Sequence, residues 1–258
     1  MYCPAQIHND VIVNYYPKRK VMDCVATASI NSGGSEYTMA LQTDGGLWSW
    51  GSNHLGQLGD GTTKRRNTPL KIMDSVSAGG FHSTAIRDDG SLWGWGSVRG
   101  HSDFYGNRLE PKKIMDSVIS VSAGNSYTMA ICEDNSLWGW GDNYRGGLGN
   151  GTTKGSIFPI KILDSVVQVS AGFSHTMAIR TDRSLWGWGW NEHREVADCA
   201  TGEIHAPIKI MDSVKTVSAG IFCTIAIRMD GSIWAWGNNK FGQLGDGTNE
   251  NRSSPVMI

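Results

Sequence analysis

A set of side chains that could carry acid–base chemistry or bind a metal recurs along the chain. Each stands three residues after a glycine and is followed by Thr or Ser; they are Tyr37, His82, Tyr127, His175 and Cys223. Arranged around one axis, these groups would form a polar ring. Tyrosine alternates with histidine, and each needs only to donate one hydrogen bond at the start of a strand. The alternation therefore favours a structural hydrogen bond over a catalytic or metal-binding ring.

Glycine-rich stretches could form a second kind of site, one for phosphate. They read "GQLGDG" at 56–61 and 242–247 and "GGLGNG" at 146–151. A phosphate loop opens a helix and contains Gly-Lys-Ser/Thr, whereas here a strand that starts with proline follows and no such sequence occurs. We therefore expect turns built on glycine instead of a phosphate site.

The segment 190–207 contains five possible zinc ligands, namely His193, Glu195, Asp198, Cys199 and His205. Their spacing matches no compact zinc motif, so neither a metal nor a cofactor is expected. The sequence also lacks the GxSxG, HExxH, kinase and glycosidase signatures of catalytic centres. These observations favour a protein that is not an enzyme.

The charges of the chain are nearly balanced, with 23 Lys plus Arg against 24 Asp plus Glu. A nucleic-acid-binding surface needs an excess of positive charge, and the basic cluster Lys64, Arg65 and Arg66 is more simply a solvated loop. The five cysteines are odd in number and have no CxxC spacing, which argues against a disulfide framework. No apolar run could span a membrane. We expect a cytoplasmic protein that binds neither nucleic acid nor membrane, or an exported one if it is part of a longer chain.

A repeat of 45 to 48 residues organises the sequence. The first tryptophan of a Trp-x-Trp pair occurs at 48, 93, 138, 186 and 234, and a glycine recurs at the same intervals. This length is expected of one four-stranded propeller blade. We predict an all-β protein in which residues 1–24 are an N-terminal segment with a partial repeat and residues 25–258 are a single β-propeller domain of five repeats.

Four short strands are predicted in each repeat. In repeat four, "VVQVSAG" at 166–172 and "HTMAIR" at 175–180 are the first two and "SLWGWG" at 184–189 is the third; a run such as "PIKI", starting with proline, is the fourth. Asp-Gly or a related pair between the second and third strands predicts a tight two-residue hairpin. Arg183 replaces the glycine in repeat four, so a different turn is expected there.

The Trp-x-Trp pairs are interpreted as structural. Both indoles of a pair project from one face of a strand, and burying roughly 200 Å² of each contributes about 5 kcal/mol before entropy is subtracted. If they were exposed, they would form large apolar patches. The residues expected to pack between blades are Trp48, Trp50, Trp93, Trp95, Trp138, Trp140, Trp186, Trp188, Trp234 and Trp236.

The string "VSAGxxHTMAIRxDxSLWGWG", followed by "GQLGDGT", resembles the repeats of the regulator of chromosome condensation family, especially its bacterial tubulin-suppressor-like branch. The resemblance covers residues 25–258 and implies a propeller, commonly of seven blades. Five repeats would form an unusually small ring, an open ring, or a ring completed by another chain, and an open ring should oligomerise. The ultraviolet photoreceptors of the family carry Trp in "GWRHT", where this chain has "GFSHT" at 172–176, so light sensing is not expected.

Loops that differ between repeats are the expected place of function, because a rigid scaffold presents them. Repeats two and four carry different sequences, at 97–110 and 190–207, and aromatic and arginine residues gather there and in the short turns of the same face. The predicted partner-binding residues are Phe81, Arg99, His101, Phe104, Tyr105, Phe173, Trp190, His193, Arg194 and Phe222.

These residues favour a non-enzymatic scaffold that binds another protein through the loop face of a propeller. A carbohydrate-binding, lectin-like propeller is the alternative, because an exposed aromatic ring such as that of Trp190 could stack on a sugar.

Overall fold

The computed structural model describes residues 11–13, 19–23, 25–30, 37–42, 46–71, 77–78, 82–87, 89–96, 108–197 and 202–258. These residues are all-β and contain no helix, and none could therefore cross a membrane as an apolar helix. They form one two-stranded hairpin and five four-stranded antiparallel sheets, in which neighbouring strands follow one another in the sequence. The predicted propeller of four-stranded blades is confirmed.

The hairpin and the five sheets, called blades 1 to 5, have the following bounds. The hairpin is β1 (Val11–Val13) and β2 (Arg19–Met22), and blade 1 is β3 (Val25–Ile30), β4 (Tyr37–Gln42), β5 (Leu47–Gly51) and β6 (Arg66–Lys71). Blade 2 is β7 (Ser77–Ala78), β8 (His82–Ile86), β9 (Leu92–Gly96) and β10 (Arg108–Met115). Blade 3 is β11 (Val118–Ala123), β12 (Tyr127–Cys132), β13 (Leu137–Gly141) and β14 (Ser156–Leu163). Blade 4 is β15 (Val166–Ala171), β16 (His175–Arg180), β17 (Leu185–Trp190) and β18 (Glu203–Met211), and blade 5 is β19 (Val214–Ala219), β20 (Cys223–Arg228), β21 (Ile233–Gly237) and β22 (Arg252–Met257).

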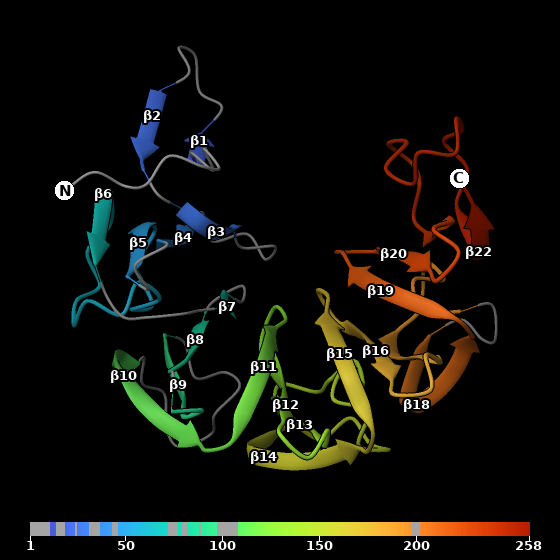
Figure 1. Cartoon of the computed structure of the whole chain (residues 1–258), viewed down its shortest axis with the longest axis horizontal. Coiled ribbons are helices and arrows are strands. Elements are labelled where there is room, and N and C mark those ends of the chain that lie inside the picture. The colour runs from blue at the N-terminus through green and yellow to red at the C-terminus, as the bar shows by residue number, and fades with distance from the viewer. Residues whose placement is uncertain are drawn as a thin grey trace.

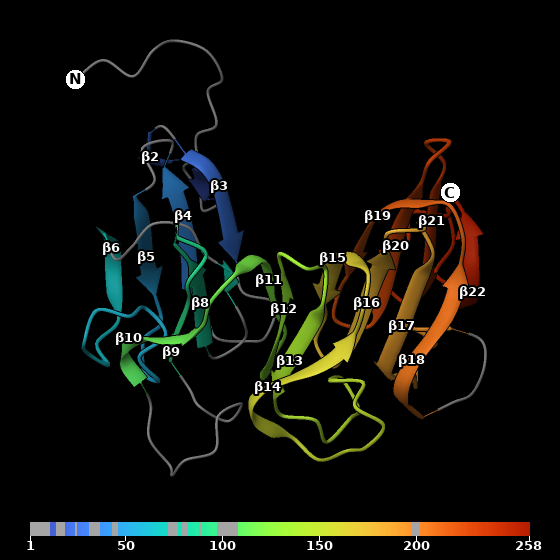
Figure 2. The ribbon, with the colours of Figure 1, turned by 60° about the horizontal axis from the view of Figure 1, so that its bottom comes forward.

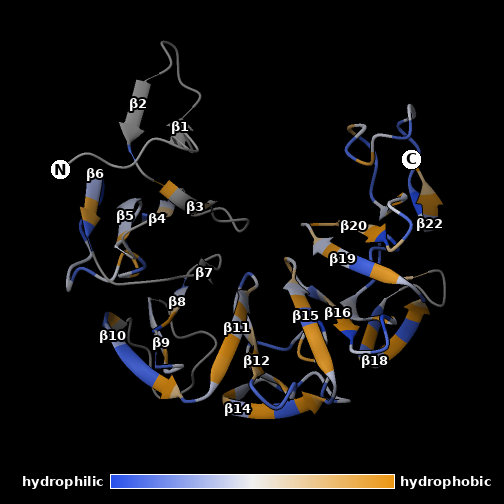
Figure 3. Ribbon diagram, in the orientation of Figure 1, coloured by the Kyte–Doolittle hydropathy of each residue, from blue (hydrophilic) through white to orange (hydrophobic). Residues whose placement is uncertain are grey.

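The blades follow one another along an arc (Figure 1). The first strand of each blade lies on the inside of the arc and the fourth strand on the outside, and β11 and β15 are side by side, as are β15 and β19. Figure 2 shows the same blades from another side, with blades 1 and 5 at opposite ends of an open arc. Apolar stretches mark the inner strands β11 and β15 (Figure 3). The five described sheets therefore form an open propeller.

The hairpin between the second and third strands differs from the predicted two-residue turn. In blade 3 the Asn135 amide donates to the Cys132 carbonyl and the Cys132 amide donates to the Ser136 carbonyl, which leaves a three-residue connection. Only its last residue has a positive φ, 62° at Asn135. This is a type I turn followed by a left-handed residue. The same two hydrogen bonds recur at Arg183, whose φ is 66°, so the expectation of a different turn there was wrong.

The proline of each repeat does not start the fourth strand, as the sequence predicted, but lies within it. Pro159, for example, is the fourth residue of β14. Gly139 pairs with Ile160 and Gly141 pairs with Ser156, so the outer strand advances four residues while its partner advances two. The resulting bulge contains the proline. Because the fourth strand is at the edge of the sheet and is irregular here, the missing N–H of the proline removes no regular hydrogen bond between strands.

The second tryptophan of each pair packs against the preceding blade. Trp188 of blade 4 is fully buried in a cluster with Met129, Ile131 and Leu137 of blade 3. Trp236 of blade 5 is likewise buried against Met177, Ile179 and Leu185 of blade 4. Trp50 in blade 1 is only half-buried, because the described residues include no preceding blade.

The first tryptophan of each pair is half-buried. In blades 2 to 5 its indole N–H takes part in a chain of hydrogen bonds at the hairpin between the second and third strands. The Trp138 Nε1–H donates to Ser136 Oγ at 2.8 Å, and the Ser136 hydroxyl donates to Asp134. Asp-Ser-Trp chains of this form recur in blades 2, 4 and 5. Blade 1 has Gly46 in place of the serine, and the buried Trp48 Nε1 has no hydrogen-bond partner among the described residues. The serine hydroxyl therefore couples the indole to the turn.

Replacing Arg183 with glycine should stabilise the protein. Arg183 is exposed and has φ 66°, a left-handed conformation that costs a non-glycine residue roughly 1–2 kcal/mol, partly offset by the greater chain entropy of unfolded glycine. We expect the free energy of unfolding in urea to rise by about 0.5–1 kcal/mol. The matched substitution Gly231→Arg, at the equivalent turn of blade 5, should lower it, and equal stability of all three proteins would contradict the assignment.

Candidate functional site

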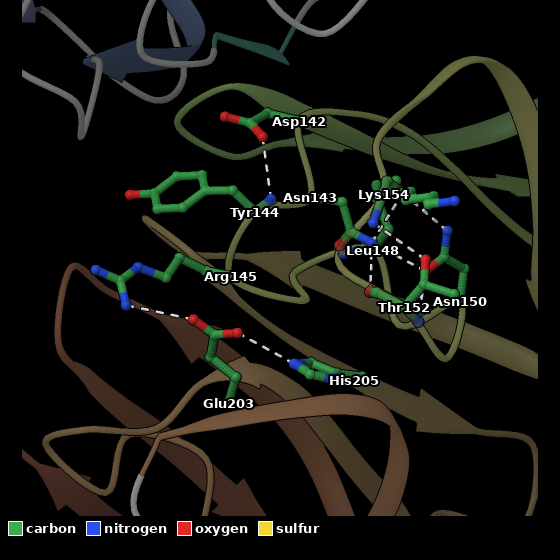
Figure 4. A network of polar contacts seen from close by, with 10 residues as sticks. All are labelled: Asp142, Asn143, Tyr144, Arg145, Leu148, Asn150, Thr152, Lys154, Glu203 and His205. Atoms are coloured by element: carbon green, nitrogen blue, oxygen red, sulfur yellow. Dashed lines mark hydrogen bonds and ion pairs between the residues drawn. The ribbon is translucent and has the colours of Figure 1, made fainter.

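The loop between the third and fourth strands is built on one buried asparagine, two residues after the last glycine of the third strand. In blade 3, Asn143 Oδ1 accepts from the Leu148 amide at 2.8 Å, and its Nδ2 donates to the carbonyls of Thr152 and Lys154 (Figure 4). Asn53 makes the three equivalent contacts in blade 1, and Asn239 makes the contacts with the Leu244 amide and the Thr248 carbonyl in blade 5. The loop is therefore held from within by one amide side chain.

Blade 4 keeps this framework although its sequence has diverged. Asn191 Oδ1 accepts from the amides of Val196 and Ala197, and its Nδ2 donates to the Ala197 carbonyl at 2.8 Å. Arg194 has φ 65° at the position where Gly146 of blade 3 has 73°. The loop that the sequence presented as replaced is thus a variant of the common loop, with arginine and glutamate in place of small or amide residues.

Backbone donors of the glycine-rich loops point into the loops themselves. The Gly146 amide donates to the Asn143 carbonyl, and the Gly149 amide donates to the Gly146 carbonyl. Thr152 N–H donates to Asn150 Oδ1. Because these N–H groups have partners within the loop, they form no cradle for an anion.

The described loops of blades 1, 3 and 4 also receive hydrogen bonds from the next blade. Trp188 Nε1 and Thr176 Oγ1 of blade 4 each donate to the Gly147 carbonyl of blade 3 at 2.8 Å. In the same way Trp236 Nε1 donates to the Val196 carbonyl, and Thr224 Oγ1 donates to the Glu195 carbonyl. A loop of one blade is therefore fixed by the tryptophan and threonine of the following blade.

The alternating Tyr and His side chains join the same junctions. Tyr127 donates its hydroxyl proton to the His175 carbonyl at 2.6 Å, across blades 3 and 4. His175 Nε2 lies 3.0 Å from Thr224 Oγ1, whose proton is directed to the Glu195 carbonyl, so Nε2 is the donor. Burial lowers the pKa of His175 to about 3, which keeps its imidazole neutral near neutral pH. These residues can position a junction but cannot exchange protons with solvent in that range.

Four of the predicted partner-binding residues come together on the loop face, where the turns after the first strands and the loops after the third strands meet. The ring centroid of Phe222 lies 4.8 Å from that of His193, 5.3 Å from that of Trp190 and 6.1 Å from that of Phe173. We call these four residues the aromatic cluster. Arg194, also predicted, lies in the same loop, where it has a φ of 65°. The predicted residues Phe81, Arg99, His101, Phe104 and Tyr105 lie outside the described residues.

Arg145 of blade 3 extends this cluster and was missed from the sequence. Its guanidinium lies 4.7 Å from the ring centroid of Trp190 and 5.1 Å from that of Tyr144. Its Nη1 donates to Glu203 Oε1 at 3.3 Å, and His205 contacts the other oxygen of Glu203 (Figure 4). A shallow pocket lies between Tyr144, Arg145 and Phe173. Arg145 could have been found by aligning the loops on their asparagines, because it occupies the position of His193.

Exposed apolar side chains also lie in the turns and loops of blades 3 to 5 on the same face. Tyr144 is 57% exposed, Ile221 is 45% exposed and Phe241 is 91% exposed. Phe241 holds in blade 5 the loop position that Arg145 and His193 hold in blades 3 and 4. Neighbouring apolar groups at this exposure are characteristic of an interaction surface.

Glu195 lies directly beneath the aromatic cluster. Its side chain is fully buried, and its Oε2 accepts from the His193 amide at 2.8 Å while its Oε1 has no hydrogen-bond partner among the described residues. Burial raises the pKa of Glu195 to about 7. Within the described part of the chain no three His, Cys, Asp or Glu side chains are grouped to hold a metal. The site is therefore an aromatic and arginine surface above one protonatable carboxyl group.

The fold and this surface define the molecule as an open β-propeller with a loop-face site. Models of the regulator of chromosome condensation (RCC1) repeat match residues 44–86, 118–146, 134–179, 166–195, 214–243 and 230–258, which together are more than half of the chain. The chain belongs to the RCC1-repeat family.

Solved structures share the fold. Human WBSCR16 is 21% identical with a TM-score of 0.80, and the match covers 91% of this chain and 67% of that one. Yeast RCC1 (Prp20), in its complex with Kap60, is 20% identical with a TM-score of 0.78, and the match covers 91% of this chain and 61% of that one. Prp20p of Saccharomyces cerevisiae gives 17% identity, a TM-score of 0.59 and coverages of 91% and 76%. This chain spans about two thirds of the length of the first two structures.

Removing the loop asparagine should destabilise the protein. Asn143 is 2% exposed, and Asn143→Ala would leave the Leu148 amide and two carbonyls without their partners. We expect the free energy of unfolding to fall by about 2–3 kcal/mol. Asn249→Ala, at an exposed loop position, is the control and should change it by less than about 0.5 kcal/mol. Equal effects of the two substitutions would show that the loop does not depend on the amide.

Stability should depend on pH through Glu195. Its pKa is raised from the ordinary 4.5 to about 7 in the folded protein, so the folded state binds this proton more tightly than the unfolded state. The stabilisation of the folded state by this proton is fully present below pH 4.5 and is lost as the pH rises through about 7. Glu195→Gln should therefore raise the free energy of unfolding by about 2–3 kcal/mol at pH 8 and leave it nearly unchanged at pH 4.5. Urea denaturation across this range measures the difference, and a pH-independent difference would contradict the assignment.

Proposed function

We propose that this protein is a non-enzymatic scaffold that binds another protein through the loop face of blades 3 to 5. The observation that carries the proposal is the aromatic cluster itself, whose rings converge from two blades. Arg145 stacks on its Trp190 ring and on Tyr144, and the exposed side chains of Ile221 and Phe241 lie in the neighbouring turn and loop of blade 5. Tryptophan, tyrosine and arginine are the residue types enriched at the centres of protein interfaces.

The burial of the polar groups supports binding instead of catalysis. His175 is held neutral and fully buried, and the Asn side chains of the loops are used within the loops. The most exposed side chains of the loop face include Ile221 and Phe241, which can exclude water from an interface and carry no group that transfers protons.

Structural relatives support a protein as the partner class. Yeast Prp20 has been crystallised bound to Kap60, and Prp20p has been characterised for its binding to Gsp1p and histones. Those partners belong to the yeast protein. The shared fold supports the use of a propeller surface for protein recognition in this chain.

A lectin-like function is less well supported by the geometry. Stacking on a sugar needs an open indole face, whereas the guanidinium of Arg145 lies over the Trp190 ring. Trp190 Nε1 also donates to Glu192 Oε2 at 3.1 Å. The ring that the sequence offered for a sugar is therefore already engaged by protein groups.

The proposal predicts loss of binding when the cluster is truncated. The full chain would be immobilised and used to capture proteins from a lysate of its source organism, followed by an affinity measurement with the purified partner. Trp190→Ala combined with Phe222→Ala should weaken binding at least about 100-fold, since interface aromatic anchors contribute about 2 kcal/mol or more each. Phe158→Ala, on the exposed outer strand of blade 3, is the matched control and should bind normally.

Two outcomes would reject this function. The first is equal affinity of the double variant, provided that both variants unfold at similar temperatures. The second is capture of glycans instead of proteins, which would establish the lectin alternative.

A further inference from the structure

One loop position carries an amide in two blades and a carboxyl group in blade 4. Gln57 Oε1 accepts from the Leu55 amide at 2.9 Å, and Gln243 Oε1 accepts from the Phe241 amide at 3.0 Å. Glu195 Oε2 makes the same contact with the His193 amide at 2.8 Å. A protonated glutamate has the shape and neutrality of glutamine, whereas an ionised one does not. Glu195 therefore matches its counterparts only in its protonated form.

The residue held by this hydrogen bond belongs to the aromatic cluster. The side chain of His193 lies 4.8 Å from Phe222 and 5.8 Å from Trp190, measured between ring centroids. Its backbone amide is the group that Glu195 accepts from. The carboxyl group thus fixes the backbone that presents one ring of the cluster to its two neighbours.

Blade 5 seals the carboxyl group from solvent. Thr224 Oγ1 donates to the Glu195 carbonyl at 2.7 Å, and Trp236 Nε1 donates to the Val196 carbonyl at 3.0 Å. Gln243, at the same position of blade 5, is exposed because the described residues include no following blade. Glu195 is consequently buried by the next blade and not by its own loop.

The ionisable neighbours of Glu195 do not neutralise it. On its own loop these are Glu192, His193 and Arg194. Burial is the main cause of the raised pKa of Glu195 and the negative charge of Glu192 adds to it, whereas the backbone amides of Glu195 and His193 lower it. From blade 5 the neighbour is the Cys223 thiol, whose pKa is raised by burial and by the charge of Glu195. His175 of β16 reaches it only through Thr224 and is neutral. Among the described residues, no cationic side chain donates a hydrogen bond to Glu195 Oε1.

Ionisation would therefore place a negative charge with one unpartnered oxygen in a closed space. Such a charge is stabilised only if the loop opens and admits water. Arg194 offers a place for the opening, since it holds a left-handed φ of 65° where the other loops use glycine. Opening would break the His193 contact and separate the rings.

We propose that Glu195 is the positioning residue of the aromatic cluster and that the loop face binds its protein partner fully only while this side chain carries a proton. This inference rests on the proposed function for its consequence in binding. The part of the proposal that concerns the loop, namely that protonated Glu195 holds the His193 backbone, does not depend on that function; we call it the structural half. Partner affinity would then fall as the surroundings change from mildly acidic to mildly alkaline.

Hydrogen exchange of the full chain tests the structural half without a partner. Exchange of the peptide covering 190–197 would be followed at pH 6 and pH 8, with times corrected for the intrinsic pH dependence of the rate. In the wild type, protection of the His193 and Val196 amides should fall about tenfold or more at pH 8. In Glu195→Gln it should stay high at both pH values, and in Glu195→Ala it should be low at both.

Further variants separate Glu195 from its neighbours. His193→Asn removes the other titratable side chain of the cluster and should retain the pH dependence. The Asn143–Leu148 loop of blade 3 is the internal control, because it has Gly147 at this position and should show no change. Unchanged wild-type protection, or a pH dependence that survives in Glu195→Gln, would overturn the proposal.

Partner binding tests the second half separately. The affinity of a captured partner should fall from pH 6 to pH 8 for the wild type and stay constant for Glu195→Gln. Constant affinity in the wild type, together with a change in protection, would overturn the link to binding while leaving the structural half intact. Failure to capture any protein through the cluster would instead reject the proposed function.

Discussion

A hydrogen bond between consecutive blades determines most of this structure. The indole N–H of the second tryptophan, as in Trp188 and Trp236, reaches back to a loop carbonyl of the preceding blade. The bond requires a fully buried indole, a carbonyl turned inward and a loop held in one shape. In blades 1, 3, 4 and 5 the asparagine at the centre of the loop supplies that shape, and the apolar side chains of blades 3 and 4 enclose the rings of Trp188 and Trp236. Without this bond the buried indole donor would be unpaired, even where a hydroxyl of the same blade also donates to the carbonyl, as Thr176 does to Gly147.

The proposed binding surface is a by-product of the same junctions. Because the loops are fixed from below by the next blade, their outer residues can change without loss of the fold. Blade 3 presents Arg145 at one such position, blade 4 presents His193 and blade 5 presents Phe241. Recognition chemistry therefore varies on a constant framework, and among the described loops of blades 3 to 5 the loop of blade 4 departs most from the common sequence and contributes most rings to the aromatic cluster.

Sequence patterns predicted the blades well because the patterns describe burial that is repeated five times. The spacing of the Trp-x-Trp pairs and the alternation of the strands were sufficient for strand order and for an all-β fold. Features that depend on backbone detail were missed: the prolines lie in bulges, and Arg183 adopts the turn of its glycine counterparts. Arg145 was missed because the loop of repeat three looks ordinary, and its meaning comes from Trp190, a residue 45 positions away that only the fold brings near.

The junctions also have a direction. The described loops of blades 1, 3 and 4 receive their closing bonds from the blade that follows, so each of these loops depends on the next blade along the chain. The five blades are consequently not equivalent even where their sequences agree. A change in the core of blade 5 is felt at Glu195 and the rings of blade 4, whereas a change confined to blade 4 acts first on the loop of blade 3. The effect of a substitution in one blade is therefore expected first in the loop of the blade before it.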